Sequence, residues 1–395
     1  MDVVKQIRRY NAGRSPDGLA LKFSRMRGDA FSFLRGSCHL FNARLVLSGT
    51  LRKAPAVWAC GDLHADNFGC YKGAQRQLCF DIVDFDEALL APAPWDALHL
   101  LASLELGLPG DAPKAPLAQA FVEAYGAALA EGKAYWVDAA SAKPPVQSLL
   151  DKARERQRPG FLDTRTERSG RRRRIRLDNG KAWAAADVQR AAVLNTLKDF
   201  AAAQDDPAFF EVIDIARRIA GTGSLGLERS IVLVRGKGSP DANHLLDLKA
   251  AQPPSALGRV PQVQPAWADD AQRVVALQRR LQAQPVAFLH AVQIQGRPFV
   301  LRALQPSEDS IELKTRRPAA EWRQLVVTLG RCLAWAQLRS SGRGGSASAD
   351  ELMAFAAQPR WRARLIEQAD AAAAQVRADW KTFSAAYDAG AFAAG

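Results

Sequence analysis

The sequence has few cysteines and no motif that pairs them. Its 395 residues include five cysteines, an odd number, and none forms a Cys-x-x-Cys pair. They are Cys38, Cys60, Cys70, Cys79 and Cys332. This pattern argues against a disulfide framework and against a structural zinc site. We therefore expect a cytoplasmic location, where thiols stay reduced.

Long apolar runs are also missing. No uncharged apolar stretch reaches the about 18 residues that a transmembrane helix requires, so we expect no membrane span. The first residues, MDVVKQIRRYNAGRSPDG, lack the apolar core of a secretory signal. We therefore expect no export by that route.

The chain carries a net charge of +13, with 54 basic and 41 acidic residues. Such a charge attracts phosphate groups in general, whether they belong to nucleotides, nucleic acid or an acidic membrane surface. The charge alone does not select one of them. The length predicts two lobes or domains, since one domain commonly takes roughly 150 residues.

Two acidic segments near the start carry the residue types that phosphoryl transfer requires. They are GDLHADN at residues 61–67 and DIVDFD at residues 81–86. Phosphoryl transfer needs a base near the acceptor hydroxyl and a divalent cation on the phosphates. Asp62 is a candidate base, and Asn67 and Asp84 are candidate Mg²⁺ ligands. The alternative is that these polar residues only form turns.

A glycine-rich turn lies past the middle of the chain, in GTGSLG at residues 221–226. Its glycines, Gly221, Gly223 and Gly226, would let backbone N–H groups and Ser224 approach phosphates. Lys249 follows and could reach the phosphates as a point charge. A dinucleotide fold would place a helix directly after the turn, but SIVLVR at 230–235 is typical of a strand. We favour a phosphate-binding hairpin, with an ordinary glycine hairpin and a surface lysine as the alternative.

Several blocks of sequence resemble known families. CGDLHADNFG (60–69) and FDIVDFDEALLAPAPWDALHLLASL (80–104) look like the catalytic and metal-binding core of aminoglycoside and choline phosphotransferases. Together with MRGDAFSFLRG, DIARRIAGTGSLG and LGRCLAWAQLRSSG, they resemble more closely an uncharacterised bacterial family, domain of unknown function 2252 (DUF2252). The resemblance extends over most of the chain.

The resemblance implies a two-lobed, protein-kinase-like α+β fold that binds ATP and Mg²⁺. It implies Asp62 as catalytic aspartate, Asn67 and Asp84 as metal ligands, and Lys249 as the strand lysine behind the glycine loop. Ordinary kinases place that loop before the catalytic segment, so the order here implies a circular permutation. Residues 1–204 would form the catalytic segment of the large lobe, 205–305 the small lobe, and 306–395 a helical segment completing the large lobe.

The resemblance also bears on the supporting residues. Asp96 resembles the position that braces the catalytic loop, with helix capping as the alternative. Cys60 stands where these phosphotransferases have a histidine. The helix expected at 269–284 offers no acidic side chain on its face to pair with Lys249. That ion pair is therefore either missing or formed from elsewhere, with Glu308 and Glu312 as candidates.

Further residues near these motifs could support the site. Asp86 closes the second acidic segment, and His64 lies inside the first, where we expect it to pack or hydrogen-bond rather than act as a base. Arg27 and Arg35 flank the first expected helix, at 29–49. They could bind a phosphate or carboxylate, or they could face solvent.

The remaining expectations concern local structure. Residues 1–25 are typical of an irregular basic lead-in, and residues from about 184 to 219 of a helix. The polar segment 150–180 is expected to be an exposed boundary. Its run Arg171–Arg174 could bind nucleic acid through phosphates, but it lacks interleaved aromatic residues, so we expect it to be solvated.

These observations favour ATP- and Mg²⁺-dependent phosphoryl transfer to an unidentified acceptor, a small molecule. Two alternatives share the fold: transfer of AMP to a protein, and a nucleotide-binding scaffold without catalysis. A basic nucleic-acid-binding protein is the less favoured alternative.

Overall fold

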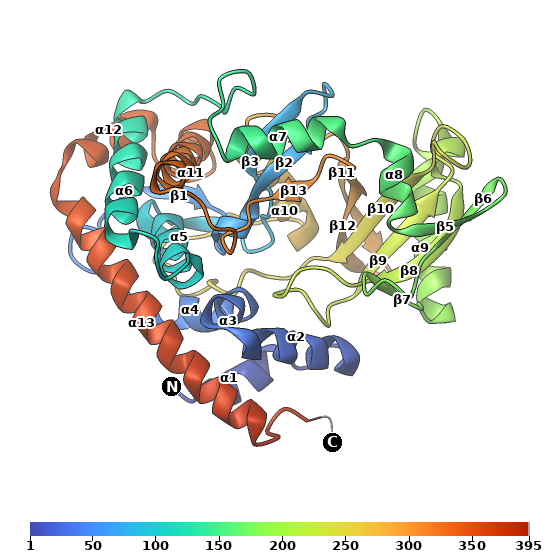
Figure 1. Cartoon of the computed structure of the whole chain (residues 1–395), viewed down its shortest axis with the longest axis horizontal. Helices are drawn as coiled ribbons and strands as arrows, with labels where there is room; N and C mark the ends of the chain where they lie inside the picture. Colours follow the sequence, from blue (N-terminus) through green and yellow to red (C-terminus); the bar gives the residue numbers. More distant parts are fainter. Residues whose placement is uncertain (394–395) are drawn as a thin grey trace.

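The computed structural model describes residues 1–393 as a mixed α+β chain, in which a helical part lies beside a six-stranded antiparallel sheet (Figure 1). The helical part is built around five helices. They are α5 (Pro94–Gly107), α6 (Lys114–Glu131), α11 (Ala319–Arg339), α12 (Ala349–Ala357) and α13 (Arg360–Asp388). Four tryptophans, Trp58, Trp95, Trp322 and Trp361, are fully buried there. One apolar core therefore joins segments from both ends of the chain.

The first residues are helical, so the expected irregular lead-in is wrong. The helices are α1 (Val3–Tyr10), α2 (Pro16–Gly28), α3 (Ala30–Gly36) and α4 (Cys38–Arg44). The Asp2 side chain caps α1 by accepting a hydrogen bond from the backbone of Lys5. Pro16 begins α2, where a missing N–H costs nothing. Helix α13 packs along α1, α2 and α3 and holds them in place, and α4 contacts α1 and α3 (Figure 1).

The sheet has the strand order β11-β12-β10-β9-β8-β7. Its strands are β7 (Ala182–Trp183), β8 (Val212–Arg218), β9 (Arg229–Val234), β10 (His244–Ala250), β11 (Leu289–Ile294) and β12 (Arg297–Leu304). Helix α9 (Asp187–Ala202) packs through Val193 and Leu197 on one face. Helix α10 (Asp270–Leu281) contacts β11 and β12.

The helix expected at 184–219 is therefore wrong in its second half, which is a 3₁₀ turn, η2 (Pro207–Phe210), followed by β8. Asp206 caps the turn, and Pro207 cannot continue a helix because it lacks an N–H. The strand then buries Ile215 among apolar residues of β9 and β10.

Two small sheets carry the acidic segments. Strand β1 (Ala56–Ala59) pairs with β4 (Leu89–Pro92). Strand β2 (Phe68–Lys72) pairs with β3 (Leu78–Ile82) on one side and with β13 (Asp309–Ser310) on the other. The first acidic segment ends in the 3₁₀ turn η1 (Ala65–Asn67), and β2 follows directly. Both acidic segments therefore start or end at buried strands.

The polar segment between the two parts is structured. It contains α7 (Val146–Glu155), α8 (Arg158–Asp163), β5 (Thr166–Ser169) and β6 (Arg172–Ile175), with β5 and β6 forming a hairpin. Arg171, Arg172 and Arg174 are exposed, as expected for a solvated run. Arg173 is buried instead, and it pairs with Asp163 and Asp241. Its charge is thus neutralised by two ion pairs and is not available to nucleic acid.

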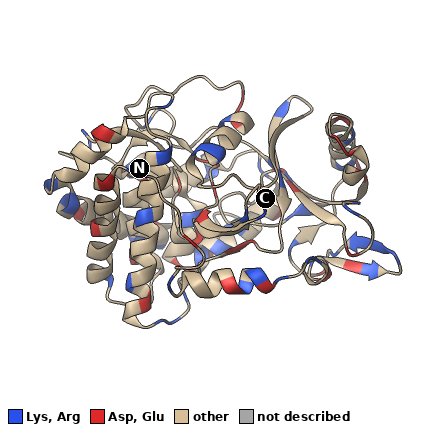
Figure 2. Ribbon diagram, turned by 90° about the horizontal axis from the view of Figure 1, so that it is seen from above, with Lys and Arg blue, Asp and Glu red and all other residues tan. Residues whose placement is uncertain are grey.

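The division at residues 204 and 305 stays a prediction. Strand β7 and helix α9 pack with the sheet although they precede residue 205. Figure 2 shows Lys and Arg distributed along the ribbons of both parts. Within residues 1–393, no helix combines the length and apolar character needed to cross a bilayer.

Candidate active site

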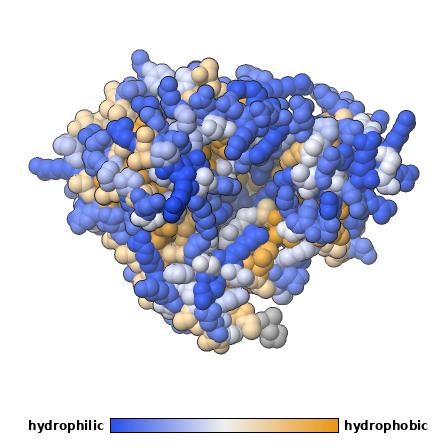
Figure 3. Space-filling model, viewed as in Figure 1, coloured by the Kyte–Doolittle hydropathy of each residue, from blue (hydrophilic) through white to orange (hydrophobic). Residues whose placement is uncertain are grey.

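A cavity of about 420 Å³ lies where the sheet meets the helical part, and the face in Figure 3 is hollowed there. Its lining includes Asn67 and Asp84 from the acidic segments, Gly221 and Ser224 from the glycine turn, and Lys249 from β10. A second hollow of about 100 Å³ shares these five residues and adds Asp62. The fold thus brings together segments that lie more than 130 residues apart in the sequence.

The loop after β1 is held rigidly at Gly61. Its φ is +83°, and a Cβ there would lie 2.0 Å from the Glu87 carbonyl oxygen, so only glycine fits. The Asp96 carboxylate, in the first turn of α5, accepts hydrogen bonds from the backbone N–H of Cys60 at 2.6 Å and of Gly61 at 2.9 Å. Burial raises the pKa of Asp96 to about 6. Asp96 therefore braces this loop.

The candidate base Asp62 lies in a poorly solvated position. Burial raises the pKa of its carboxyl, and the nearby carboxylates of Glu87 and Asp84 raise that pKa further. One carboxylate oxygen, Oδ1, lies 3.2 Å from Nε2 of His99 on α5. Sequence reasoning did not single out His99, because a histidine inside an apolar helix carries no signal of the loop that it faces.

A backbone hydrogen bond of Val83, the residue before Asp84, holds the candidate cation ligands Asn67 and Asp84 near each other. The N–H of Val83 donates to the Asn67 carbonyl at 2.9 Å. Asn67 Nδ2 donates to the Asp62 carbonyl at 2.8 Å, which leaves Oδ1 as the amide atom available to a cation. Asp84 Oδ1 accepts a 3.3 Å hydrogen bond from the N–H of Asp86. One carboxylate and one amide oxygen beside an open cavity suit Mg²⁺, which keeps several water ligands.

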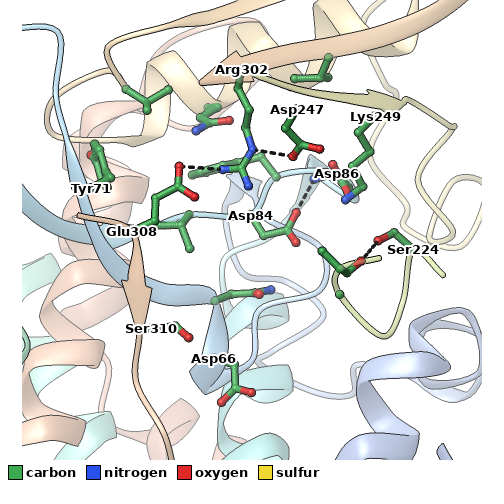
Figure 4. Close-up of a pocket in the computed structure, with 18 of the residues that line it drawn as sticks. Asp66, Tyr71, Asp84, Asp86, Ser224, Asp247, Lys249, Arg302, Glu308 and Ser310 are labelled. Atoms are coloured by element: carbon green, nitrogen blue, oxygen red, sulfur yellow. Dashed lines mark hydrogen bonds and ion pairs between the residues drawn. The ribbon is translucent and has the colours of Figure 1, made fainter. Parts of the chain in front are cut away.

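Lys249 reaches across the cavity from β10. Its Nζ forms an ion pair with Asp86 Oδ2, in the loop after β3. Figure 4 shows Asp84, Asp86 and Lys249 gathered in the same part of the cavity. Glu308 lies instead 3.8 Å from Arg302. The partner of Lys249 thus comes from the second acidic segment, and the suggestion of Glu308 or Glu312 was wrong.

The glycine turn connects β8 to β9, and its members lie in different places. Gly221, with a φ of +69°, and Ser224 line both hollows, and Gly223 lines the smaller one. Gly226 lines neither. It has a φ of +86° and packs closely against Gly18 of α2. Gly226 thus lies on the side of the turn that packs against α2, and it does not face either hollow.

Two cations of the N-terminal segment hold this turn in place. Arg14 Nη1 donates to the Gly223 carbonyl at 2.7 Å, and Lys22 Nζ donates to the same oxygen at 3.0 Å. Lys22 is fully buried, and its Nζ also donates to Asn11. Sequence reasoning missed both cations, because they lie in the segment that was taken for an irregular lead-in.

Of the other candidate residues in the helical part, Arg35 and His64 line a hollow, and Arg27 does not. Arg35 lines both hollows and lies 2.9 Å from Asp66. His64 is buried edge-on against Phe31, consistent with a packing role. Arg27 pairs with Asp388 at the surface and lines neither hollow.

The sheet side of the cavity carries a cluster that the sequence did not reveal. Asp247 on β10 is fully buried and pairs with three arginines, Arg218, Arg229 and Arg302. Figure 4 shows Arg302 between Asp247 and Glu308. Burial alone would raise the pKa of Asp247, but the arginines hold it well below its usual range. All three arginines line the cavity, so their remaining N–H groups are candidates for anion binding.

The chain belongs to the family described as uncharacterised protein conserved in bacteria (DUF2252), whose profile matches residues 14–386. This confirms the family expected from the sequence. No curated protein and no solved structure matches the chain.

Proposed function

We propose that this protein is an ATP- and Mg²⁺-dependent phosphotransferase with a kinase-like, circularly permuted arrangement of its two parts. The observation that carries the proposal is the ion pair between Lys249 and Asp86. It joins the sheet to the acidic segments across a cavity that also exposes Asn67, Asp84 and the glycine turn. Phosphoryl transfer depends mainly on such positioning and on charge neutralisation.

Each group has a task that its surroundings support. Asp62 accepts the proton of the acceptor hydroxyl, since burial raises its pKa and makes the ionised carboxylate a stronger base. Asn67 Oδ1 and Asp84 hold the cation, which neutralises phosphate charge when bound. Lys249 and the backbone of the glycine turn bind the phosphates.

The alternative of a non-catalytic scaffold has as its main support the lack of an acidic partner for Lys249 in the sequence motifs. Asp86 supplies a partner, and this contact favours an enzyme over a scaffold.

The decisive experiment follows label from ATP in the wild type and in Asp62→Asn. We expect the γ-phosphate to be transferred, turnover to fall about 10²- to 10⁴-fold in the variant, and nucleotide affinity to change little. The acceptor is sought among small hydroxyl compounds in a cell extract depleted of protein. Transfer of label from the α-phosphate to protein would instead show AMP transfer, and the absence of any transfer would support the scaffold.

A further inference from the structure

Three side chains from separate segments converge beside the first acidic loop. Cys38 begins α4, Asp62 lies in the loop after β1, and His99 lies in the middle of α5. The thiol sulfur, one carboxylate oxygen and one imidazole nitrogen all lie within 4.8 Å of one another. These residues carry no short spacing motif in the sequence, and only the fold assembles them.

The imidazole of His99 is oriented with a free lone pair toward the cluster. His99 is fully buried, and its Nδ1 lies 2.9 Å from the carbonyl of Leu63. Because a carbonyl only accepts, Nδ1 must donate, and Nε2 of the neutral ring carries the lone pair. A histidine whose second nitrogen donates to a backbone carbonyl is the usual arrangement of a metal ligand.

Two of the three atoms that face each other in the cluster lack hydrogen-bond partners. Asp62 Oδ1 and His99 Nε2 are both buried and make no hydrogen bond within the described residues, although they lie 3.2 Å apart. Two acceptors in such contact repel each other unless a proton or a cation lies with them. A buried polar atom without a partner is costly, so the cluster has unused binding capacity.

We propose that Cys38, Asp62 and His99 form a binding site for one Zn²⁺ ion. A set of one thiolate, one imidazole and one carboxylate is typical of zinc, with bonds of about 2.0–2.3 Å. In a tetrahedral site such bonds place nitrogen and oxygen ligands about 3.3 Å apart. The distance from Asp62 Oδ1 to His99 Nε2 agrees with this geometry.

The surroundings supply the remaining features of a zinc site. Cys38 and Asp62 both line the smaller hollow of about 100 Å³, which provides an entry path and room for a water as fourth ligand. Asn42 Nδ2 donates to Cys38 Sγ at 3.2 Å and so orients the sulfur.

Nearby cations already have partners and do not occupy the cluster. Arg14 and Lys22 donate to the Gly223 carbonyl, Arg35 pairs with Asp66, and Lys249 pairs with Asp86. The carboxylate of Glu87 adds negative charge close to Asp62.

Zinc binding here does not depend on the proposed function, but it has a consequence for it. The ion would use the same carboxylate that we propose as the base. Zinc and acceptor activation would then exclude each other, so zinc would inhibit phosphoryl transfer.

The site is tested with Co²⁺ as a spectroscopic substitute for zinc, added to reduced, chelator-treated, full-length protein. We expect one equivalent to produce thiolate-to-cobalt absorption and the strong visible bands of a tetrahedral ion, and Zn²⁺ to remove both. Cys38→Ser should lose the thiolate absorption. The matched control is Cys79→Ser, since Cys79 is the half-buried cysteine on β3, and it should retain the absorption.

Three results would overturn the site: no stoichiometric binding, thiolate absorption that persists in Cys38→Ser, or absorption that disappears in Cys79→Ser. If Cys38→Ser does not fold, as judged by circular dichroism, X-ray absorption of the zinc-loaded wild type decides. One sulfur with nitrogen and oxygen ligands supports the proposal. A shell without sulfur, or with two or more sulfurs, contradicts it.

Discussion

The two sides of the cavity hold their charges in opposite ways. On the helical side, Asp62, Glu87 and Asp96 form no ion pair with a lysine or arginine among the described residues, and burial raises their pKa values. On the sheet side, Asp247 is fully buried, but three arginines hold its pKa well below the usual range. Burial alone therefore does not decide the charge of a carboxyl group. The ion-pair partners decide the charge of each carboxyl group. The carboxylate on the sheet side is therefore already neutralised by arginines, whereas the carboxyl groups on the helical side can take up a proton or bind a cation.

The largest effect on stability is expected from Asp247→Asn. The change leaves Arg218, Arg229 and Arg302 without their shared carboxylate. Breaking a buried ion pair by removing one partner commonly costs about 3–5 kcal/mol. Denaturant unfolding of wild type and variant measures the loss.

Asp388→Asn is the matched control, because Asp388 forms its ion pair with Arg27 at the surface. The control should unfold almost like the wild type, since exposed ion pairs contribute little. If Asp247→Asn and Asp388→Asn lowered the free energy of unfolding equally, the buried ion pairs of Asp247 would be no more stabilising than a surface pair.

On the helical side, Asp96→Asn should change how stability depends on pH. The pKa of Asp96 rises from 3.8 to about 6 on folding. Between these pH values the folded state therefore binds more protons than the unfolded state. The contribution of Asp96 to the free energy of unfolding falls as pH rises through this range. At about 1.4 kcal/mol per pKa unit, the loss is roughly 3 kcal/mol.

The measurement is the difference in free energy of unfolding between wild type and Asp96→Asn at several pH values. The variant cannot titrate at this position, so the wild type should lose stability relative to it between about pH 4 and pH 6. A difference that stays constant over that range would show that folding does not raise the pKa of Asp96.

A smaller effect is expected from Lys249→Met, which removes the ion pair between β10 and the second acidic segment. A hydrogen bond to a charged group contributes about 1.5–3 kcal/mol, so ATP affinity should fall roughly 10- to 100-fold. Equilibrium binding of a fluorescent ATP analogue gives the value. Lys237→Met, a change in the loop between β9 and β10 that lies outside the cavity lining, should bind like the wild type.

Much of the helical architecture could be predicted from the sequence. The apolar spacing predicts a helix at about 319–339, and α11 spans these residues. The Leu- and Ala-rich stretch 95–132 predicts two helices with a break near Pro109–Pro116, and α5 and α6 are separated there. The N-terminal helices were missed because α2 shows only weak amphipathic spacing and becomes stable through contact with α13. Strand β8 was missed because its sequence also fits a helix, and only pairing with β9 decides between them.

The candidate site shows the same limit. The family resemblance implied that Asn67, Asp84, Ser224 and Lys249 belong to one site, and these four residues line one cavity. It could not supply the partner of Lys249, since Asp86 lies 163 positions away and meets it only across the interface of the two parts.

The central claim is that the cavity binds ATP with Mg²⁺ held by Asp84. The most direct test is calorimetric titration of ATP into the wild type and Asp84→Ala, each with and without Mg²⁺. The account predicts that Mg²⁺ strengthens ATP binding in the wild type roughly 10-fold or more, and that this gain disappears in the variant while binding without Mg²⁺ stays similar. Absence of ATP binding in the wild type, or the same Mg²⁺ effect in both proteins, would contradict the account.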